Sequence, residues 1–274
     1  MYLITGSRGQ LGQELAKRLP HALLTNSTQL NLTDSEAVSG FVRTHGITHI
    51  INCSAYTNVD GAEEEPRQAR LLNEEAPRIL AETGLPLIHI STDYVFDGRR
   101  GRPYEPGDAP APLSMYGKTK YRGEQAVLKT AQTALIIRTS WLYSSCGNNF
   151  VRTMLRLGAE RERLRVVADQ VGSPTYAGDL AQFIVSVLPR MRQGQKSVYH
   201  YAGEGVASWY DFACEIMSLT GLSCRVEAIP SSAYACKAVR PFYSVLSKES
   251  AKRDFQLAIP HWKESLSLCL QQFQ

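Results

Sequence analysis

The stretch that decides the fold opens the chain and reads Tyr2-Leu3-Ile4-Thr5-Gly6-Ser7-Arg8-Gly9-Gln10-Leu11-Gly12. Its first four residues have the composition of a short strand, and Leu11, Leu15 and Leu19 continue it with helical spacing. A strand, a glycine-rich turn and a helix in this order open a dinucleotide-binding fold. The unpaired N–H groups at the start of such a helix attract phosphate groups. We therefore expect a cofactor pyrophosphate at residues 6–12.

The three glycines of this turn have separate roles in that arrangement. Gly6 permits a tight turn, Gly9 leaves room for the pyrophosphate beside the backbone, and Gly12 lets the helix pack closely on the strand. Three glycines at this spacing also occur in purely structural turns, but their place between a strand and a helix favours cofactor binding. The predicted cofactor residues of the turn are Gly6, Ser7, Arg8, Gly9, Gln10, Leu11 and Gly12.

The end of the second predicted strand indicates which dinucleotide is bound. A fold specific for NAD usually carries Asp or Glu there, to hold the ribose 2′-hydroxyl. Ala22-Leu23-Leu24 is followed instead by Thr25-Asn26-Ser27, which contains no acid. Arg8 in the glycine-rich turn is suited to bind a 2′-phosphate, unless it is simply exposed to solvent. The sequence favours NADPH and leaves NADH open.

Four further apolar runs have the length and composition of buried strands, at 47–53, 87–90, 134–138 and 198–201. Helical segments separate them, and strands that alternate with helices build a parallel sheet covered on both faces. The predicted fold class is therefore α/β, a Rossmann-type doubly wound parallel sheet with a smaller C-terminal substrate-binding lobe. We expect the Rossmann domain to comprise 1–142 and about 176–219, and the lobe about 143–175 and 220–274.

Composition and charge argue against several other classes of protein. The chain has 274 residues, a net charge of +4 and no basic run longer than Arg99-Arg100-Gly101-Arg102, so nucleic-acid binding is not expected. Its six cysteines are scattered, with no Cys-x-x-Cys pair, which favours reduced thiols in a cytoplasmic protein. Neither a signal peptide nor an apolar run of membrane-spanning length is recognisable, and we expect no membrane contact.

Tyr116 and Lys120 form a candidate proton-transfer pair within Met115-Tyr116-Gly117-Lys118-Thr119-Lys120. Residues four apart share one face of a helix. An ammonium group beside a phenol favours the phenolate and lowers the pKa of the tyrosine, which can then exchange a proton with a carbonyl/alcohol pair. Taken alone, the pair also fits a solvated helix face. Thr92 favours the catalytic interpretation, because it follows the predicted strand 87–90 at the edge where α/β folds bind ligands.

Local patterns fill in the segment between these motifs. Asp60-Gly61-Ala62-Glu63 has the spacing of a capping box, which predicts that a helix begins there and runs to about Glu82. Glu63-Glu64-Glu65 then lies in the solvated first turn of this helix and is not expected to bind a metal. His89, inside a strand, is expected in the core. The segment 98–113 is rich in Gly, Pro and charge, and long loops of this kind are often functional.

Eight short motifs follow one another along essentially the whole chain. They are Gly6-x-x-Gly9-x-x-Gly12, Ser91-Thr92-Asp93-Tyr94-Val95-Phe96, Tyr116-Gly117-Lys118-Thr119-Lys120, Arg138-Thr139-Ser140-Trp141, Asn148-Asn149-Phe150, Asp169-Gln170-x-Gly172-Ser173-Pro174-Thr175, Ser208-Trp209-Tyr210-Asp211 and Arg240-Pro241. In these motifs the chain resembles the extended short-chain dehydrogenase/reductases and, more narrowly, the dTDP-4-dehydrorhamnose reductase family. The resemblance implies reduction, with NADPH or NADH, of the 4-keto group of a dTDP-6-deoxy-L-lyxo-hexulose to give dTDP-L-rhamnose.

The resemblance also implies roles for single residues. Tyr116 donates a proton to the carbonyl oxygen, Lys120 lowers the pKa of Tyr116 and holds the nicotinamide ribose, and Thr92 orients the reacting oxygen. Beyond the glycine-rich turn, the implied cofactor residues are Asn31, Leu32, Ser54, Ala55, Tyr56, Tyr116 and Lys120. The implied substrate residues are Thr57, Val95, Trp141, Asn149, Gln170 and Arg240, with Trp141 on the sugar ring and Arg240 on the diphosphate.

A metal ion is not predicted. Some family members hold magnesium between subunits through acidic residues, and Glu14 stands at one such position, but Gly178 takes the place of another acid. A homodimer is compatible with the resemblance, although the sequence does not determine the oligomeric state.

Two other functions remain open on the sequence. A nucleotide-sugar epimerase or dehydratase would share the scaffold, and Asp93 directly after Thr92 fits a dehydratase. Such enzymes usually carry an acid after the second strand, which is absent here. A regulatory subunit like that of methionine adenosyltransferase would keep the fold and act by binding a partner, because fold alone does not fix function.

Overall fold

A computed structural model describes residues 1–273 and contains one six-stranded parallel sheet. In spatial order its strands are β10 (Lys196–His200), β5 (Ala134–Thr139), β4 (Leu87–Thr92), β3 (His49–Asn52), β1 (Tyr2–Thr5) and β2 (Leu23–Leu24). The chain crosses from β1 to β2 on one side and returns to β3 on the other. The sheet order therefore reverses beside β1, and ligands bind outside the strand ends at such a reversal.

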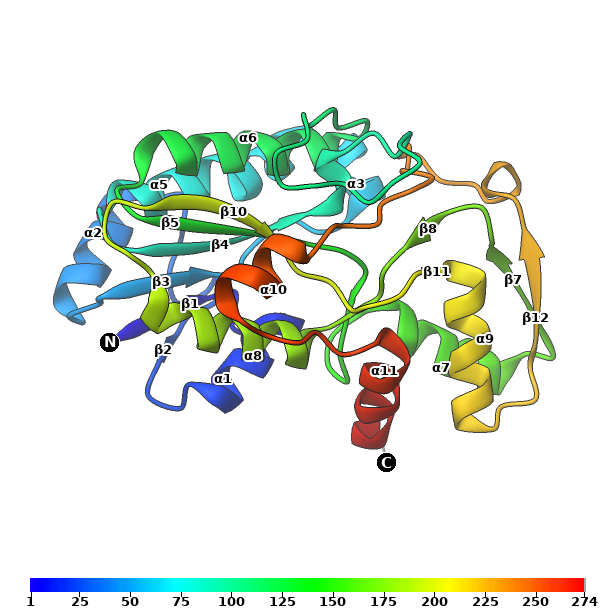
Figure 1. Ribbon diagram of the computed structural model, residues 1–274. Helices are drawn as coiled ribbons and strands as arrows, with labels where there is room; N and C mark the ends of the chain where they lie inside the picture. Colours follow the sequence, from blue (N-terminus) through cyan, green and yellow to red (C-terminus); the bar gives the residue numbers. More distant parts are fainter. Residues whose placement is uncertain (274) are drawn as a thin grey trace.

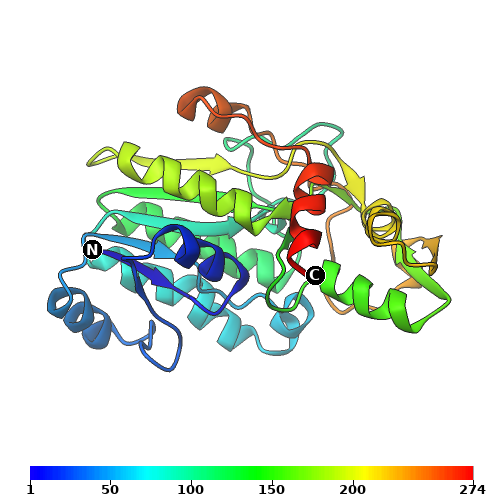
Figure 2. The same ribbon diagram turned by 90° about the horizontal axis from the view of Figure 1, so that it is seen from below.

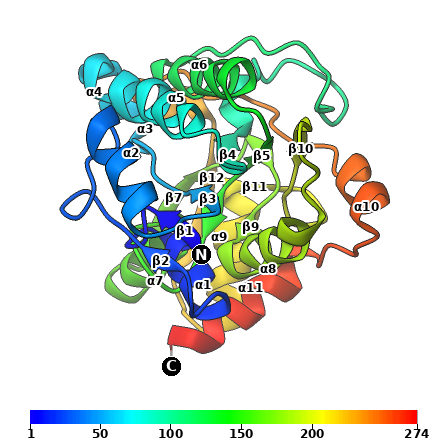
Figure 3. The ribbon, with the colours of Figure 1, turned by 90° about the vertical axis from the view of Figure 1, so that its left-hand side faces the viewer.

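Helices cover both faces of this sheet, as the alternating pattern predicted (Figures 1 and 3). One face packs against α2 (Ser35–Thr44), α5 (Ala76–Glu82) and α6 (Met115–Thr130), and the other against α1 (Gln10–Arg18), α8 (Ala177–Val187) and α10 (Glu249–Phe255). The strands are apolar on both faces because both faces are buried. Before α5 come α3 (Val59–Glu64), α4 (Pro66–Arg70) and a π-helical turn, η1 (Leu71–Glu75). The α/β prediction is confirmed.

A smaller lobe stands at the carboxyl edge of the sheet (Figure 1). It contains α7 (Phe150–Glu160), α9 (Trp209–Thr220) and three strand pairs. These are β12 (Arg225–Ile229) with β7 (Arg163–Val167), β11 (Ala207–Ser208) with β8 (Val171–Gly172), and β6 (Leu142–Tyr143) with β9 (Thr175–Tyr176). The C-terminal α11 (Trp262–Leu270), red in Figure 2, lies at the junction of the two parts. Short 3-10 turns occur at η2 (Asp93–Val95), η3 (Leu188–Arg190), η4 (Ser231–Ala233) and η5 (Gln271–Phe273).

The packing differs from the expected domain boundaries at two elements. Phe212 and Ile216 of α9 are buried with the lobe residues of α7 and β7, although the boundary near 219 placed α9 in the Rossmann domain. Ala251 of α10 is buried in the sheet core, although the expected lobe included 220–274. Hydrophobic periodicity shows that a helix has a buried face, but it does not show which core that face joins.

Candidate active site

The glycine-rich turn has the geometry of an anion site. Gly9 caps α1 without a side chain, and the first main-chain N–H with an acceptor inside the helix belongs to Gln13. The N–H groups of Gln10, Leu11 and Gly12 therefore have no acceptor inside the helix. A Cβ on Gly12 would lie 2.4 Å from the Gly6 carbonyl oxygen. The close packing of this turn requires glycine and fits a bound pyrophosphate.

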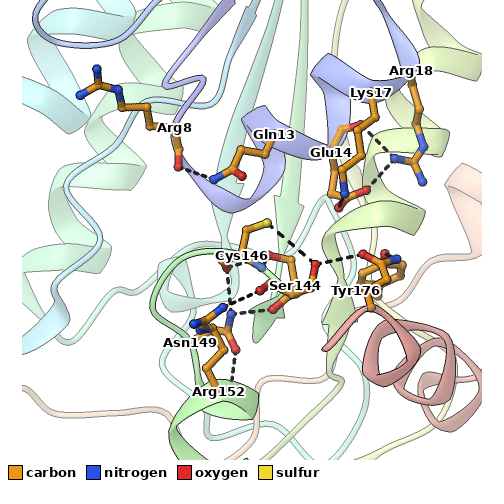
Figure 4. Close-up of polar contacts among 12 residues, drawn as sticks. Arg8, Gln13, Glu14, Lys17, Arg18, Ser144, Cys146, Asn149, Arg152 and Tyr176 are labelled. Carbon is orange, nitrogen blue, oxygen red and sulfur yellow. Dashed lines mark hydrogen bonds and ion pairs between the residues drawn. The ribbon is translucent and has the colours of Figure 1, made fainter. Parts of the chain in front are cut away.

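The surroundings of Arg8 suit a 2′-phosphate. The N–H of Ser7 donates to the Thr25 carbonyl at 3.0 Å, which holds the turn against the end of β2. No acid follows β2, and the exposed Arg8 guanidinium makes no ion pair within residues 1–273. Figure 4 shows the Arg8 side chain extending away from α1. A free guanidinium at this edge can bind a phosphate with two parallel hydrogen bonds.

The remaining predicted cofactor residues flank the strand ends, and several hold the backbone there. Asn31 accepts from Thr33 in a local turn, and the side chain of Leu32 is buried in the core. Ser54, Ala55 and Tyr56 follow β3, next to the glycine-rich turn. A Cβ on Gly6 would lie 2.8 Å from the Ser54 nitrogen, so the two segments touch. Cofactor contacts by these residues stay predictions.

Thr92, Tyr116 and Lys120 meet at the carboxyl end of β4. Lys120 is buried, and its ammonium donates to the Ile90 carbonyl of β4 at 2.6 Å. Ser114 caps α6 by accepting from the Gly117 N–H, which fixes the first turn that carries Tyr116. A Cβ on Gly117 would lie 2.2 Å from the Tyr94 carbonyl oxygen, so glycine lets α6 approach the strand end.

The pKa of Tyr116 differs from the one expected beside Lys120. Loss of hydration is the main cause that raises the pKa of Tyr116, and the nearby Thr92 hydroxyl opposes the rise. Burial lowers the pKa of Lys120 to about 8. The expected lowering of the Tyr116 pKa by Lys120 is therefore not found, since the ammonium is directed at Ile90. At neutral pH Tyr116 is a neutral phenol, the form that can donate a proton to a developing alkoxide.

Two buried polar residues support this site: Asn73, which was not singled out on the sequence, and Asp93, which was considered there only for a dehydratase. The Asn73 amide accepts from the Tyr56 N–H, donates to the Tyr56 carbonyl and donates to Thr119 of α6. Asp93 accepts from the Thr92 hydroxyl at 3.0 Å, and burial raises the pKa of its carboxyl to about 6. An asparagine on the apolar side of a helical pattern is the one signal that could have indicated Asn73.

Asn149 and Val95 have partners within the protein, and their substrate contacts stay predictions. The Asn149 amide nitrogen donates to the Ser144 and Cys146 carbonyls, and its oxygen accepts from the Arg152 N–H, so it caps α7 (Figure 4). The amide nitrogen also donates to the Gln10 side chain at 3.0 Å, which ties the lobe to α1. The Val95 side chain is completely buried in a core cluster with Tyr104. Only the main chain of Val95 remains available to a substrate.

Arg240 bridges the lobe and the Rossmann part. Its guanidinium donates to Asp60 at 2.8 Å and to the Tyr94 hydroxyl at 3.3 Å. Asp60 does not start a helix as the capping box predicted, because Asn58 caps α3 by accepting from the Gly61 N–H. Asp60 instead accepts from Arg240 and from the main chain at Lys237 and Ala238. A diphosphate contact by Arg240 stays a prediction.

The three remaining predicted substrate residues are Trp141, Gln170 and Thr57. Trp141 follows β5 and its ring stacks on Trp209, with 3.5 Å between centroids. Gln170 is buried directly before β8, and Thr57 is exposed after β3. Their substrate contacts stay predictions.

Glu14 takes cationic partners from its own helix. Lys17 donates to one carboxylate oxygen at 2.5 Å and Arg18 to the other at 2.7 Å (Figure 4). Within residues 1–273, no group of three or more metal-ligating side chains comes together.

Comparison with known proteins assigns the family. The family model described as RmlD substrate binding domain matches residues 1–274. The chain belongs to this family. A dTDP-4-dehydrorhamnose reductase of Aggregatibacter actinomycetemcomitans is 37% identical, over 96% of both chains. A dTDP-4-keto-6-deoxy-D-glucose reductase of Streptomyces niveus is 39% identical, over 97% of this chain and 95% of its own.

A solved structure of a relative includes the cofactor. It is a dTDP-4-dehydrorhamnose reductase from Bacillus anthracis in complex with NADP, which is 38% identical and has a TM-score of 0.95 over 99% of this chain and 98% of its own. The Rossmann-type fold predicted for this family is thus shown.

Proposed function

We propose that this member of the RmlD family reduces the 4-keto group of dTDP-4-dehydro-6-deoxy-L-mannose with NADPH and forms dTDP-L-rhamnose. The observation that carries the proposal is the meeting of Thr92, Tyr116 and Lys120 at the end of β4, in a chain with an NADP-binding reductase as a near relative. The site holds a neutral phenol, the form that can give a proton to the oxygen of a ketone as the ketone is reduced.

The chain's own residues have distinct tasks in this reaction. Bound NADPH supplies a hydride to C4 of the sugar. Tyr116 gives its proton to the C4 oxygen as negative charge develops there, and Thr92 holds that oxygen in place. Lys120 holds the ribose next to this edge. Arg8 and the free N–H groups of α1 bind the phosphates.

A keto-sugar comparison tests the proposal and its substrate. Purified protein is mixed with NADPH and either dTDP-4-dehydrorhamnose or dTDP-4-keto-6-deoxy-D-glucose, and NADPH absorbance is followed. We expect consumption with both, and a higher kcat/KM for the first. A preference for the second sugar would assign the activity named for the Streptomyces niveus relative. Absence of consumption with either sugar would favour a non-catalytic role.

The cellular location and the oligomeric state of the protein are also part of this proposal. No helix within residues 1–273 has the length and apolar character needed to span a membrane. We infer a cytoplasmic location, where nucleotide sugars and reduced cysteines occur, and fractionation tests it. A homodimer is also proposed, and light scattering of the purified protein tests it.

A further inference from the structure

Trp141 has a strained backbone that its surroundings must hold. Its φ is +48°, in the left-handed region that non-glycine residues rarely adopt. It lies two residues after Thr139, which pairs in register with Thr92 of β4. The Trp141 indole therefore leaves the end of β5, next to the end of β4 that carries the Thr92 hydroxyl.

Trp209 covers one face of that indole. The two rings are stacked, with centroids 3.5 Å apart and planes 7° from parallel. Trp209 is the first residue of α9, and a complete capping box of Ser208 and Asp211 fixes its backbone. Phe150 packs on Trp209 as well, at 4.7 Å between centroids. Trp209 is therefore a rigid support.

Gly172 lies over the opposite face of the same indole, at its Nε1–Cε2 edge. A Cβ at this position would lie 2.7 Å from Cε2 of Trp141. In the antiparallel β8–β11 pair, Gly172 lies opposite Ala207, two residues before Trp209. The β8–β11 pair thus contains Gly172, which leaves room for the Trp141 ring, and leads directly into Trp209, which supports that ring.

We infer that Trp209 is a positioning residue that orients Trp141 against the hexose ring of the nucleotide sugar. The inference rests on the proposed function and on Trp141 as the sugar contact. It assigns a function to the Ser-Trp-Tyr-Asp motif, which the reaction itself does not use. Because Trp209 and Gly172 lie on its two faces, the half-buried indole meets the hexose along its free edge. A loosened indole therefore weakens the hexose contact and leaves the nucleotide contact unchanged.

Binding of dTDP-L-rhamnose and of dTDP alone separates these contributions. Dissociation constants are measured by calorimetry for wild type, Trp209→Leu and Trp209→Phe. We expect Trp209→Leu to weaken dTDP-L-rhamnose about tenfold, the loss of one aromatic contact, with the affinities for dTDP and NADPH unchanged. Trp209→Phe keeps an aromatic face and should recover part of the loss.

Trp262→Phe is the matched control. Trp262 lies in the same hydrophobic cluster and packs on Phe212 and His261. Its replacement should lower stability without changing the ratio of the two affinities. The circular dichroism of the stacked indoles should be kept in Trp262→Phe, which shows that the control leaves the Trp141–Trp209 pair intact.

Two results would overturn the inference in distinguishable ways. If Trp209→Leu loses the stacked-indole signal but keeps the wild-type ratio of dTDP-L-rhamnose to dTDP affinity, Trp209 does not orient the sugar contact. If Trp209→Leu does not fold, Trp209→Met, which also removes the aromatic ring, takes its place, and an unchanged ratio in that variant excludes the role. If Trp141→Ala also leaves the ratio unchanged, Trp141 is not the sugar contact. If wild type binds neither ligand, the proposed function itself fails.

Discussion

Tyr116 and Lys120 act in this structure as two separately tuned groups. Dehydration raises the pKa of the phenol, while burial lowers the pKa of the ammonium. Proton donation at neutral pH then depends on the hydroxyl of Tyr116 itself. We expect Tyr116→Phe to bind NADPH as wild type does and to lose most of its turnover, about 10²-fold or more.

Tyr121→Phe is the matched control for that variant. It removes a hydroxyl from the same helix, where the Tyr121 hydroxyl accepts from the Gln125 amide. Turnover measured by NADPH absorbance should stay near wild type in this control. A Tyr116→Phe protein with near wild-type turnover would remove the tyrosine from the mechanism.

The lowered pKa of Lys120 predicts a pH limit on activity. Burial lowers the Lys120 pKa to about 8. The side chain therefore carries its positive charge below about pH 8 and loses that charge above it. We expect kcat/KM for NADPH, which reports the free enzyme, to fall as the pH rises through about 8. Lys118→Gln changes an exposed lysine of the same turn and should keep the profile. A flat profile up to the ordinary lysine range contradicts a required charge on Lys120.

The position of α6 depends on a contact with η1 that leaves no space for a side chain at Gly123. A Cβ on Gly123 would lie 1.9 Å from the Asn73 carbonyl oxygen of η1. We expect Gly123→Ala to push α6 away, to lower the free energy of unfolding by about 1–3 kcal/mol and to reduce turnover. Urea denaturation and the NADPH assay measure the two effects.

Gly40→Ala is the control, because nothing lies within 4 Å of a Cβ at that position of α2. It should raise the free energy of unfolding by up to about 1 kcal/mol, through helix propensity alone. Equal stability of Gly123→Ala and wild type would show that α6 is not placed by this contact.

Strands, turns and helices were predicted from the sequence more accurately than the contacts of single side chains. The glycine-rich turn, the strand that ends at Thr92 and the helix of Tyr116 follow from local patterns and are found in the structure. The partner of Asp60 could not be predicted, because Arg240 is 180 positions away and a nearer capping pattern competes for the same carboxylate. Asn149 likewise matches a family motif, yet its four hydrogen bonds are within the protein.

Across the whole molecule, His200 joins the loop 98–113 to the sheet. Its Nδ1–H donates to the Tyr104 carbonyl at 3.0 Å, and Tyr104 in turn bridges to Leu246 of the C-terminal part. Burial, with a contribution from Arg138, lowers the pKa of His200 to about 3. The ring is therefore neutral in the folded protein at pH values where an unfolded histidine is charged.

This difference gives stability a defined pH dependence. Between the unfolded pKa of 6.5 and the folded value of about 3, the unfolded chain binds the extra proton, so stability falls as the pH falls. We expect His200→Gln to remove up to about 1.4 kcal/mol per pH unit from that slope. Urea denaturation at about pH 6.5 and pH 5 measures it, with the exposed His21→Gln as control. An unchanged slope in His200→Gln would assign the dependence to other groups.

The cores that α9 and α10 join could not be predicted from the sequence. Both helices have the amphipathic pattern that predicts burial, but the partner surface depends on long-range packing. The two-part architecture was predicted, whereas its exact division required the structure.

Isotope transfer tests whether hydride passes to C4 of a dTDP-4-keto sugar with Tyr116 as the proton donor. NADPH with both hydrogens at nicotinamide C4 replaced by deuterium is used with dTDP-4-dehydrorhamnose, and the product is analysed by NMR. We expect one deuterium at C4 of dTDP-L-rhamnose with wild type and Tyr121→Phe, and almost no product with Tyr116→Phe. Deuterium at another carbon, or unlabelled product, would contradict this mechanism.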